Sequence, residues 1–206
     1  MATKNVKVWD IGVRTFHWTL VLLFFISYLT GDDDSLIHVY SGYAILGLVL
    51  LRIVWGVIGT KHARFTDFVY GRATAKAYVV SILKGRPIHY LGHNPLGGWM
   101  VVTLLIFLLL TTWTGLEAYG AEGKGPLADA NIHLISPAMA DDDEHHGKDS
   151  IWEDLHEGLA NFTLFLVILH ILGVIFSSLV HRENLVKAMI DGKKQIDLDE
   201  TDRSQK

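Results

Sequence analysis

Long apolar runs dominate the pattern of hydrophobic and polar positions along this chain. Four of them, at about 13–30, 38–58, 97–116 and 156–180, reach or approach the roughly 20 residues that an α-helix needs to cross a bilayer. The pattern therefore predicts an all-α fold, an integral membrane four-helix bundle. The first run is the weakest because its strictly apolar part is short and contains His17. A buried helix of a soluble protein is the alternative for that run.

The remaining segments fit one transmembrane domain over residues 1–181 and a polar tail over 182–206. Apolar residues at near-helical spacing predict a short amphipathic helix over 65–83, lying on the inner membrane surface. A Gly-Arg-Pro sequence at 85–87 should end it. Pro95 suits the first turn of the third long helix. The last residues, 197–206, are predicted to lack stable structure.

The charge pattern predicts the orientation. The segment before the first run and the tail are rich in Lys and Arg, and the connection 60–88 has six bases and one acid. The connection 31–37 has three Asp and no base, and the connection 117–154 has ten acids and two Lys. Because Lys and Arg collect on the cytoplasmic side, both termini should lie inside the cell. Nucleic-acid binding by the basic connection is the less favoured alternative.

Four of the eleven histidines lie within or at the edge of a predicted span, where a polar side chain is costly and indicates function. His38 and His156 stand at the outer ends of their helices. His17 precedes the outer end of its helix by 13 residues, or about 20 Å at about 1.5 Å per residue. His170 follows His156 by 14 residues, about 21 Å on the same scale. The four side chains therefore form an outer and an inner layer.

The same spacing gives the direction of two side chains. Fourteen residues at about 100° each leave His170 only about 40° from His156 around the helix. Two imidazoles facing lipid would be unfavourable, so both should face the interior of the bundle. Each layer then offers two imidazoles from different helices, as bis-histidine haem ligation requires. The sequence thus predicts two haems about 20 Å apart.

Other uses of intramembrane histidine stay open at this point. A single imidazole can hydrogen-bond between helices or serve in a proton relay. Zinc would need further ligands, and carboxylates are scarce in both layers. The chain has no cysteine, which excludes disulfides, iron–sulfur clusters and covalently attached haem.

Five short motifs accompany the histidines: Arg14-Thr15-Phe16-His17-Trp18, His38-Val39-Tyr40-Ser41-Gly42-Tyr43, Arg52-Ile53-Val54-Trp55-Gly56, Gly92-His93-Asn94-Pro95-Leu96-Gly97 and Leu155-His156-Glu157. Together with the 14-residue spacing, which is the most specific mark, they resemble the prokaryotic cytochrome b561 family. That family is related to the b-type cytochrome subunits of nickel–iron hydrogenases. The resemblance covers about residues 5–194.

The resemblance implies a diheme membrane cytochrome b. It pairs His17 with His170 and His38 with His156, the pairs that depth gives independently. Arg52 follows His38 by 14 residues, so it should lie in the inner layer and meet a haem propionate. A side chain reaching back to the inner surface is the alternative. Arg14 and Lys7 are secondary candidates of the same kind. His89 and His93 are candidates to bind a quinone or its protons, although a polar turn would also explain them. The other histidines are expected at the surface: His62, His133, His145, His146 and His181.

The expected function is electron transfer in the bacterial inner membrane, between the quinone pool and a periplasmic partner such as a c-type cytochrome. The acidic groups at Asp32–Asp34 and 141–144 could dock a basic carrier. Whether the chain is a quinone-linked oxidoreductase in its own right is left open, as are the direction of flow and the oligomeric state. The alternatives are a membrane anchor of a larger oxidoreductase such as a hydrogenase, and a haem-free transporter or sensor.

Overall fold

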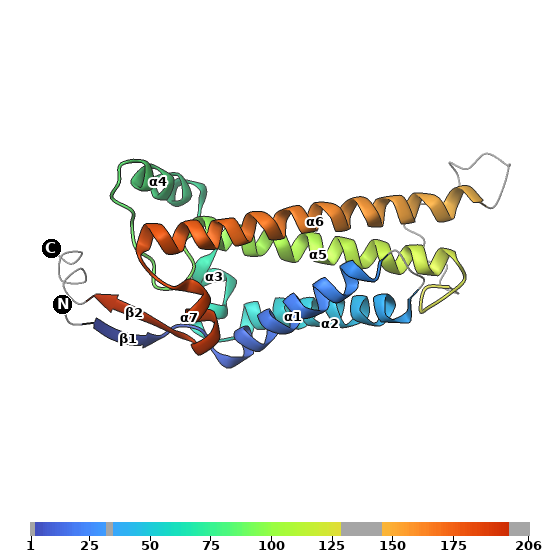
Figure 1. Ribbon diagram of the computed structural model, residues 1–206, viewed down its shortest axis with the longest axis horizontal. Coiled ribbons are helices and arrows are strands. Elements are labelled where there is room, and N and C mark those ends of the chain that lie inside the picture. The colour runs from blue at the N-terminus through green and yellow to red at the C-terminus, as the bar shows by residue number, and fades with distance from the viewer. Residues whose placement is uncertain (1–2, 32–34, 129–145, 198–206) are drawn as a thin grey trace. The chain divides into compact units, whose positions relative to one another are not determined.

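The computed structural model of the protein describes residues 3–31, 35–128 and 146–197. Four long helices form most of this part: α1 (Ile11–Leu29), α2 (Leu36–Ile58), α5 (Pro95–Ala121) and α6 (His146–His181) (Figure 1). Each is long and apolar enough to cross a membrane, which confirms the four predicted spans. The acidic groups at Asp32–Asp34 and 141–144 lie outside the described residues.

The apolar side chains of these helices are mostly exposed. Only 11% of the α1 span and 28% of the α2 span is buried, and 17% of each of the other two. Leu22, Leu51 and Phe176 are examples of large apolar residues that are more than half exposed. Surface this apolar is stable against lipid and unfavourable in water. The low burial of α1 also contradicts the alternative of a buried helix in a soluble protein.

Two of the long helices differ in extent from their predictions. α5 covers 95–121 instead of 97–116, and Asn94 caps its start by accepting a 2.8 Å hydrogen bond from the Gly97 amide. α6 begins at His146, ahead of the predicted 156. Hydropathy finds the part of a helix that suits lipid, whereas the helix itself continues through polar residues that favour it.

The predicted amphipathic helix over 65–83 was wrong as a single element. After a short 3-10 turn, η1 (Lys61–Ala63), the structure has two helices, α3 (Phe65–Phe68) and α4 (Arg72–Leu83). Gly71 caps α4 in an extended conformation, with φ −65° and ψ 159°, so the two helices cannot be continuous. The predicted end is confirmed, because Gly85 follows α4 with a φ of +67° that favours glycine.

The chain ends fold together, which the all-α prediction missed. Strands β1 (Thr3–Lys7) and β2 (Lys193–Asp197) pair antiparallel, with Thr3 opposite Asp197 and Lys7 opposite Lys193. A short helix, α7 (Leu185–Asp191), precedes β2. The protein is thus mostly helical, and residues 182–197 are folded rather than a plain polar tail. The prediction for the last nine residues lies outside the described part.

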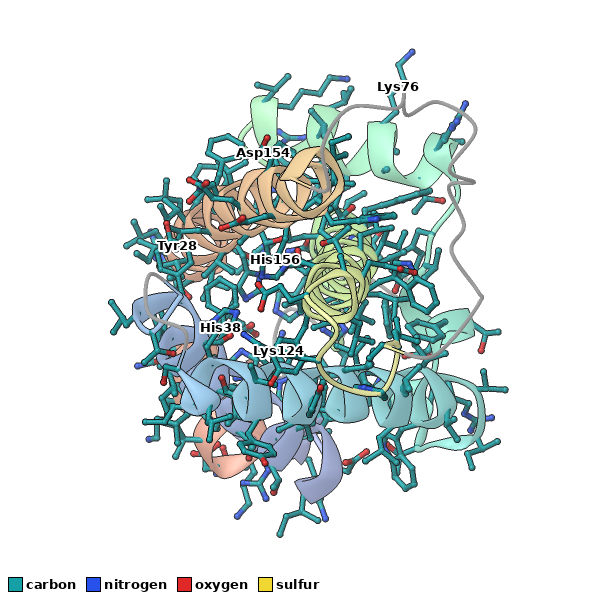
Figure 2. The ribbon with its side chains drawn as sticks, turned by 90° about the vertical axis from the view of Figure 1, so that its right-hand side faces the viewer. Tyr28, His38, Lys76, Lys124, Asp154 and His156 are labelled. Carbon is teal, nitrogen blue, oxygen red and sulfur yellow. The ribbon has the colours of Figure 1, made fainter. Side chains whose placement is uncertain are left out.

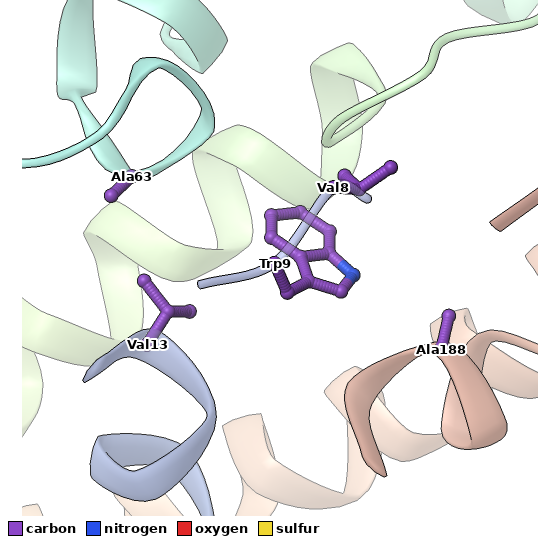
Figure 3. Packing of buried hydrophobic residues seen from close by; sticks show 5 residues of the cluster. All are labelled: Val8, Trp9, Val13, Ala63 and Ala188. Carbon is purple, nitrogen blue, oxygen red and sulfur yellow. The ribbon is translucent and has the colours of Figure 1, made fainter. Parts of the chain in front are cut away.

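A small apolar cluster joins these ends to the helices. It consists of Val8, Trp9, Val13, Ala63 and Ala188, all nearly fully buried (Figure 3). The Gly192 carbonyl accepts hydrogen bonds from the amides of Val8 (2.9 Å) and Trp9 (3.2 Å). The Arg14 guanidinium donates to the Ile190 carbonyl. These contacts fix the first turns of α1, which carry Arg14 and His17.

The chain forms two compact units, and each long helix contributes a segment to both. The first unit consists of Met1–Val21, Leu50–Thr103 and Ile168–Lys206; the second consists of Leu22–Val49 and Leu104–Val167. His38 and His156 belong to the second unit, whereas His17, His170 and Arg52 belong to the first. Each predicted pair of histidines therefore falls within a single unit.

Candidate functional site

The second unit brings together the two histidines predicted for the outer layer. The ring centroids of His38 in α2 and His156 in α6 are 5.8 Å apart, and the ring planes are inclined at 84°. Figure 2 shows both side chains pointing into the space among the helices. Leu155, the neighbour of His156, is 44% exposed instead. The face of α6 that carries His156 therefore points inward, as predicted.

Both imidazoles are held by backbone carbonyl groups. Nδ1 of His38 lies 2.9 Å from the Ser27 carbonyl oxygen, and Nδ1 of His156 lies 2.8 Å from the Thr111 carbonyl oxygen. A carbonyl can only accept, so each Nδ1 carries the proton and each Nε2 keeps its lone pair. Histidines that ligate metals are usually oriented by such a bond. The two rings are thus prepared to ligate through Nε2.

Glycines shape the space around this pair. A Cβ atom at Gly115 of α5 would lie 2.9 Å from Cε1 and 3.1 Å from Nδ1 of His156, so only glycine lets the imidazole approach α5 this closely. Gly42 lies one turn after His38, and no atom lies within 4 Å of the place where its Cβ would be. Gly115 therefore permits the position of the His156 ring, and a Cβ atom at Gly42 would meet no protein atom.

The first unit places the two inner-layer histidines near one another. The imidazoles of His17 in α1 and His170 in α6 are close enough to interact electrostatically. Nδ1 of His17 is buried without a hydrogen-bond partner. Gly173, three residues after His170, has no atom within 4 Å of its Cβ position. Like the outer pair, this pair comes from two different helices.

Two arginines in the first unit have unused donors. Arg52 is only 4% exposed; its Nη2 donates to the Ala63 carbonyl at 3.0 Å, and its Nη1 is buried without a partner. Nε of Arg14 is likewise buried and unpartnered. Buried guanidinium donors without acceptors are costly and indicate a missing anion. Arg52 is therefore buried, as predicted, and does not reach the surface. Lys7, by contrast, is exposed.

His93 lies just before α5, between two aromatic rings. Its ring centroid is 4.6 Å from that of Trp9 and 4.7 Å from that of Phe68, and its Nδ1 is buried without a partner. Burial, followed by the positive charge of Arg52, lowers the pKa of His93 to about 3. The ring is therefore neutral at physiological pH and can offer a hydrogen bond to a neutral ligand. His89 forms an ion pair with Glu183 instead, at 2.6 Å.

Several contributors were missed by sequence reasoning. Ser27 and Thr111 act through backbone carbonyls, which no side-chain pattern reveals. The closely spaced hydroxyl residues at 111, 112 and 114 within an apolar helix are a sequence signal for a polar site on that helix. His62 and His181, expected at the surface, are instead partly buried and bonded to Asp67 and Tyr78 respectively.

The described residues suit haem better than a metal ion bound by protein alone. Among residues 3–31, 35–128 and 146–197, no three His, Cys, Asp or Glu side chains are grouped to hold a metal. Haem iron needs only two axial ligands from the protein, which each imidazole pair can supply. The unpartnered Nε of Arg14 and Nη1 of Arg52 suit the carboxylates that haem carries.

Comparison with known proteins decides the family. The family model described as prokaryotic cytochrome b561 matches residues 8–192. This chain belongs to the prokaryotic cytochrome b561 family. It is therefore a b-type haem cytochrome with membrane helices, which contradicts the alternative of a haem-free transporter or sensor.

Two relatives are described in the same words. A probable Ni/Fe-hydrogenase B-type cytochrome subunit of Rhodobacter capsulatus is 25% identical, over 92% of this chain and 81% of the relative. The protein of the same description from Azotobacter vinelandii is 26% identical, over 96% of this chain and 91% of the relative. No solved structure matches the chain.

Gly115→Ala should weaken haem binding. The added methyl group would displace His156 and break its bond to the Thr111 carbonyl, and such losses of ligand support cost about 10- to 100-fold in metal affinity. Haem per purified chain, measured from the reduced spectrum, checks this. Gly158→Ala in α6 is the matched control, since nothing lies within 4 Å of its Cβ position. Equal haem content in both variants would contradict the expectation.

Proposed function

We propose that this chain is a diheme b-type cytochrome of the bacterial inner membrane that passes electrons between the quinone pool and a periplasmic redox partner. The observation that carries the proposal is the two imidazole pairs, with His156 and His170 fourteen residues apart on α6. Haem held by each pair would supply one-electron chemistry, tuned by its ligands and surroundings. Residues of this chain would ligate the iron, neutralise the propionates and contact the quinone.

His38 and His156 would be the axial ligands of one site, and His17 and His170 those of the other. At the first of these, the Ser27 and Thr111 carbonyls hold the rings and make Nε2 more basic. At the second, Nδ1 of His17 lacks such a bond. The two sites thus differ in the support of their ligands, which is one means by which a protein separates two reduction potentials.

Arg52 and Arg14 would neutralise propionates at the His17–His170 site. Both have a buried nitrogen without an acceptor, and a carboxylate would satisfy each. Positive charge beside a haem favours its reduced form, so these residues would also raise the potential of that site. This role keeps the predictions for Arg52 and Arg14 and leaves out Lys7, which is exposed.

The quinone would meet the first unit near His93. A neutral imidazole with an unused Nδ1, held between Trp9 and Phe68, can exchange a hydrogen bond with a quinone oxygen. His89 lies near the surface, on Glu183, and suits exchange of protons with water. This arrangement supports quinone chemistry on the side where the chain ends lie.

The names of the relatives favour one specific partner. The proteins from Rhodobacter capsulatus and Azotobacter vinelandii are described as probable Ni/Fe-hydrogenase subunits. A second candidate function is therefore membrane anchoring and electron transfer for a hydrogenase or a similar oxidoreductase. The acidic connections of this chain, Asp32–Asp34 and 141–144, favour a soluble basic carrier such as a c-type cytochrome. Copurification of a catalytic subunit with a tagged chain would favour the hydrogenase assignment.

The purified protein should exchange electrons with quinones. We expect either rapid reduction of the b-type bands by an added quinol, or rapid oxidation of the reduced bands by an added quinone, because the potentials decide the direction. Stopped-flow absorbance with ubiquinone and menaquinone analogues measures both. A tail-only lipid without the quinone ring is the control. If both reactions fail in correctly folded, haem-loaded protein, the quinone assignment is wrong.

A reporter fused after Lys206 should report a cytoplasmic location. The bases of the connection 60–88 and of both chain ends lie on one side of four spans, and such residues resist export. Alkaline phosphatase and green fluorescent protein fusions at Lys206 give opposite readings on the two sides. A second fusion within the acidic 129–145 segment should give the reverse result. A periplasmic Lys206 would overturn the proposed orientation.

A further inference from the structure

The first unit holds a second polar cluster that takes no part in either imidazole pair. Its centre is Tyr78 of α4, which is only 2% exposed. The Tyr78 hydroxyl lies 3.0 Å from Nε2 of His181, the last residue of α6, and the two rings are stacked with centroids 6.2 Å apart. A phenol and an imidazole in contact can each accept and release a proton. The burial of Tyr78 favours a specific connection over a chance surface contact.

Hydrogen bonds continue from Tyr78 toward the start of α5. Ser177, one turn before His181, lies close enough to Tyr78 for its hydroxyl to interact with the phenol oxygen. Its Oγ accepts a 3.1 Å hydrogen bond from Nδ2 of Asn94. Asn94 adjoins His93, whose Nδ1 is buried without a partner. This end of the cluster therefore reaches Asn94, the sequence neighbour of the residue proposed to meet the quinone.

In the other direction the cluster reaches the surface. The ring centroids of His181 and His89 lie 5.5 Å apart, a separation that one bridging water can span. Nε2 of His89 lies 2.6 Å from Glu183, whose other oxygen lies 3.1 Å from Nζ of Lys194. The His89 side chain is 36% exposed, against 11% for Glu183 and 5% for Lys194. His89 is thus the member that water reaches most easily.

The charges of the members fit proton passage. Burial raises the pKa of Tyr78, so the hydroxyl keeps its proton. Burial acts to raise the pKa of Glu183 as well, but the hydrogen bond from His89 and the charge of Lys194 bring it below the usual value. The carboxylate is therefore ionised and attracts protons to His89. Tyr90 also packs against Tyr78, with ring centroids 5.7 Å apart, and adds no charge.

We propose that His89, His181, Tyr78 and Ser177 form a proton relay between water and the quinone-reacting position beside Asn94 and His93, with Glu183 as the group that attracts protons to its entrance. The proposal rests on the proposed quinone-linked function and adds the route of the protons. It assigns roles to residues that neither the imidazole pairs nor the arginines explain.

The proton balance is complete. Reducing a quinone to a quinol takes two electrons, from the redox partner of the proposed function, and two protons. For each proton, Nε2–H of protonated His181 passes its proton to the Tyr78 oxygen while the Tyr78 proton moves to Ser177 and the Ser177 proton to a quinone oxygen. His89 then restores the proton on His181 from water. The reverse sequence releases protons when a quinol is oxidised.

Two variants separate a relay from a structural tie. Tyr78→Phe keeps the ring stacked on His181 but removes the hydroxyl. His181→Gln keeps a hydrogen-bonding side chain beside Tyr78 but cannot carry a proton. Tyr70→Phe is the control, because Tyr70 packs on Tyr90 in the same aromatic group but outside the relay. The readouts are steady-state turnover with a quinone analogue, the haem spectrum, and the rate of haem reduction by dithionite.

We expect the turnover rate of both relay variants to be at least about tenfold lower than that of Tyr70→Phe. A loss of this size is usual when an acid–base group is removed. Their spectra and dithionite reduction should match those of the unaltered protein. Turnover equal to the control in either spectrally intact variant would overturn the relay. If Tyr78→Phe loses haem, His181→Gln alone decides. If the unaltered protein reacts with no quinone, both the proposed quinone-linked function and the relay are wrong. If it reacts and a spectrally intact relay variant turns over as fast as the control, only the relay is wrong.

Discussion

The cost of placing imidazole rings inside apolar helices governs this structure. Each long helix presents lipid-compatible residues over most of its surface, and the histidines that break that pattern lie in pairs. The ring centroids of His38 and His156 lie 5.8 Å apart, and each Nδ1–H donates a hydrogen bond to a backbone carbonyl. These carbonyls satisfy one nitrogen of each ring and leave Nε2 available as a ligand. The same constraint makes this arrangement suitable for a haem iron.

The ends of the chain serve the other pair. β1 and β2 join, and the cluster of Val8, Trp9, Val13, Ala63 and Ala188 fixes the first turns of α1. Arg14 and His17 lie in those turns, and both keep a buried nitrogen without a partner. Arg52, held by the Ala63 carbonyl, adds a third. Folding thus orders polar groups before their ligand is present, which lowers the cost of binding it.

The sequence was sufficient for the spans and for the two histidine sets, because both follow from local rules. Hydropathy depends on neighbouring residues, and a 14-residue spacing fixes depth and direction on one helix, as with His156 and His170. The β1–β2 pairing joins residues about 190 positions apart and leaves no local signal in two short polar strands. The carbonyls of Ser27 and Thr111 and the close approach at Gly115 depend on packing between helices, so the sequence alone could not place them.

The central claim is that four histidines hold two haems in two defined pairs. Counting haem in the purified protein and in four single His→Ala variants tests it most directly. The account predicts two haems per chain, with one and the same haem lost from His38→Ala and His156→Ala. His17→Ala and His170→Ala should each lose the other haem, recognised by its own spectrum and potential. A single haem per chain, or losses that pair the histidines differently, would contradict it.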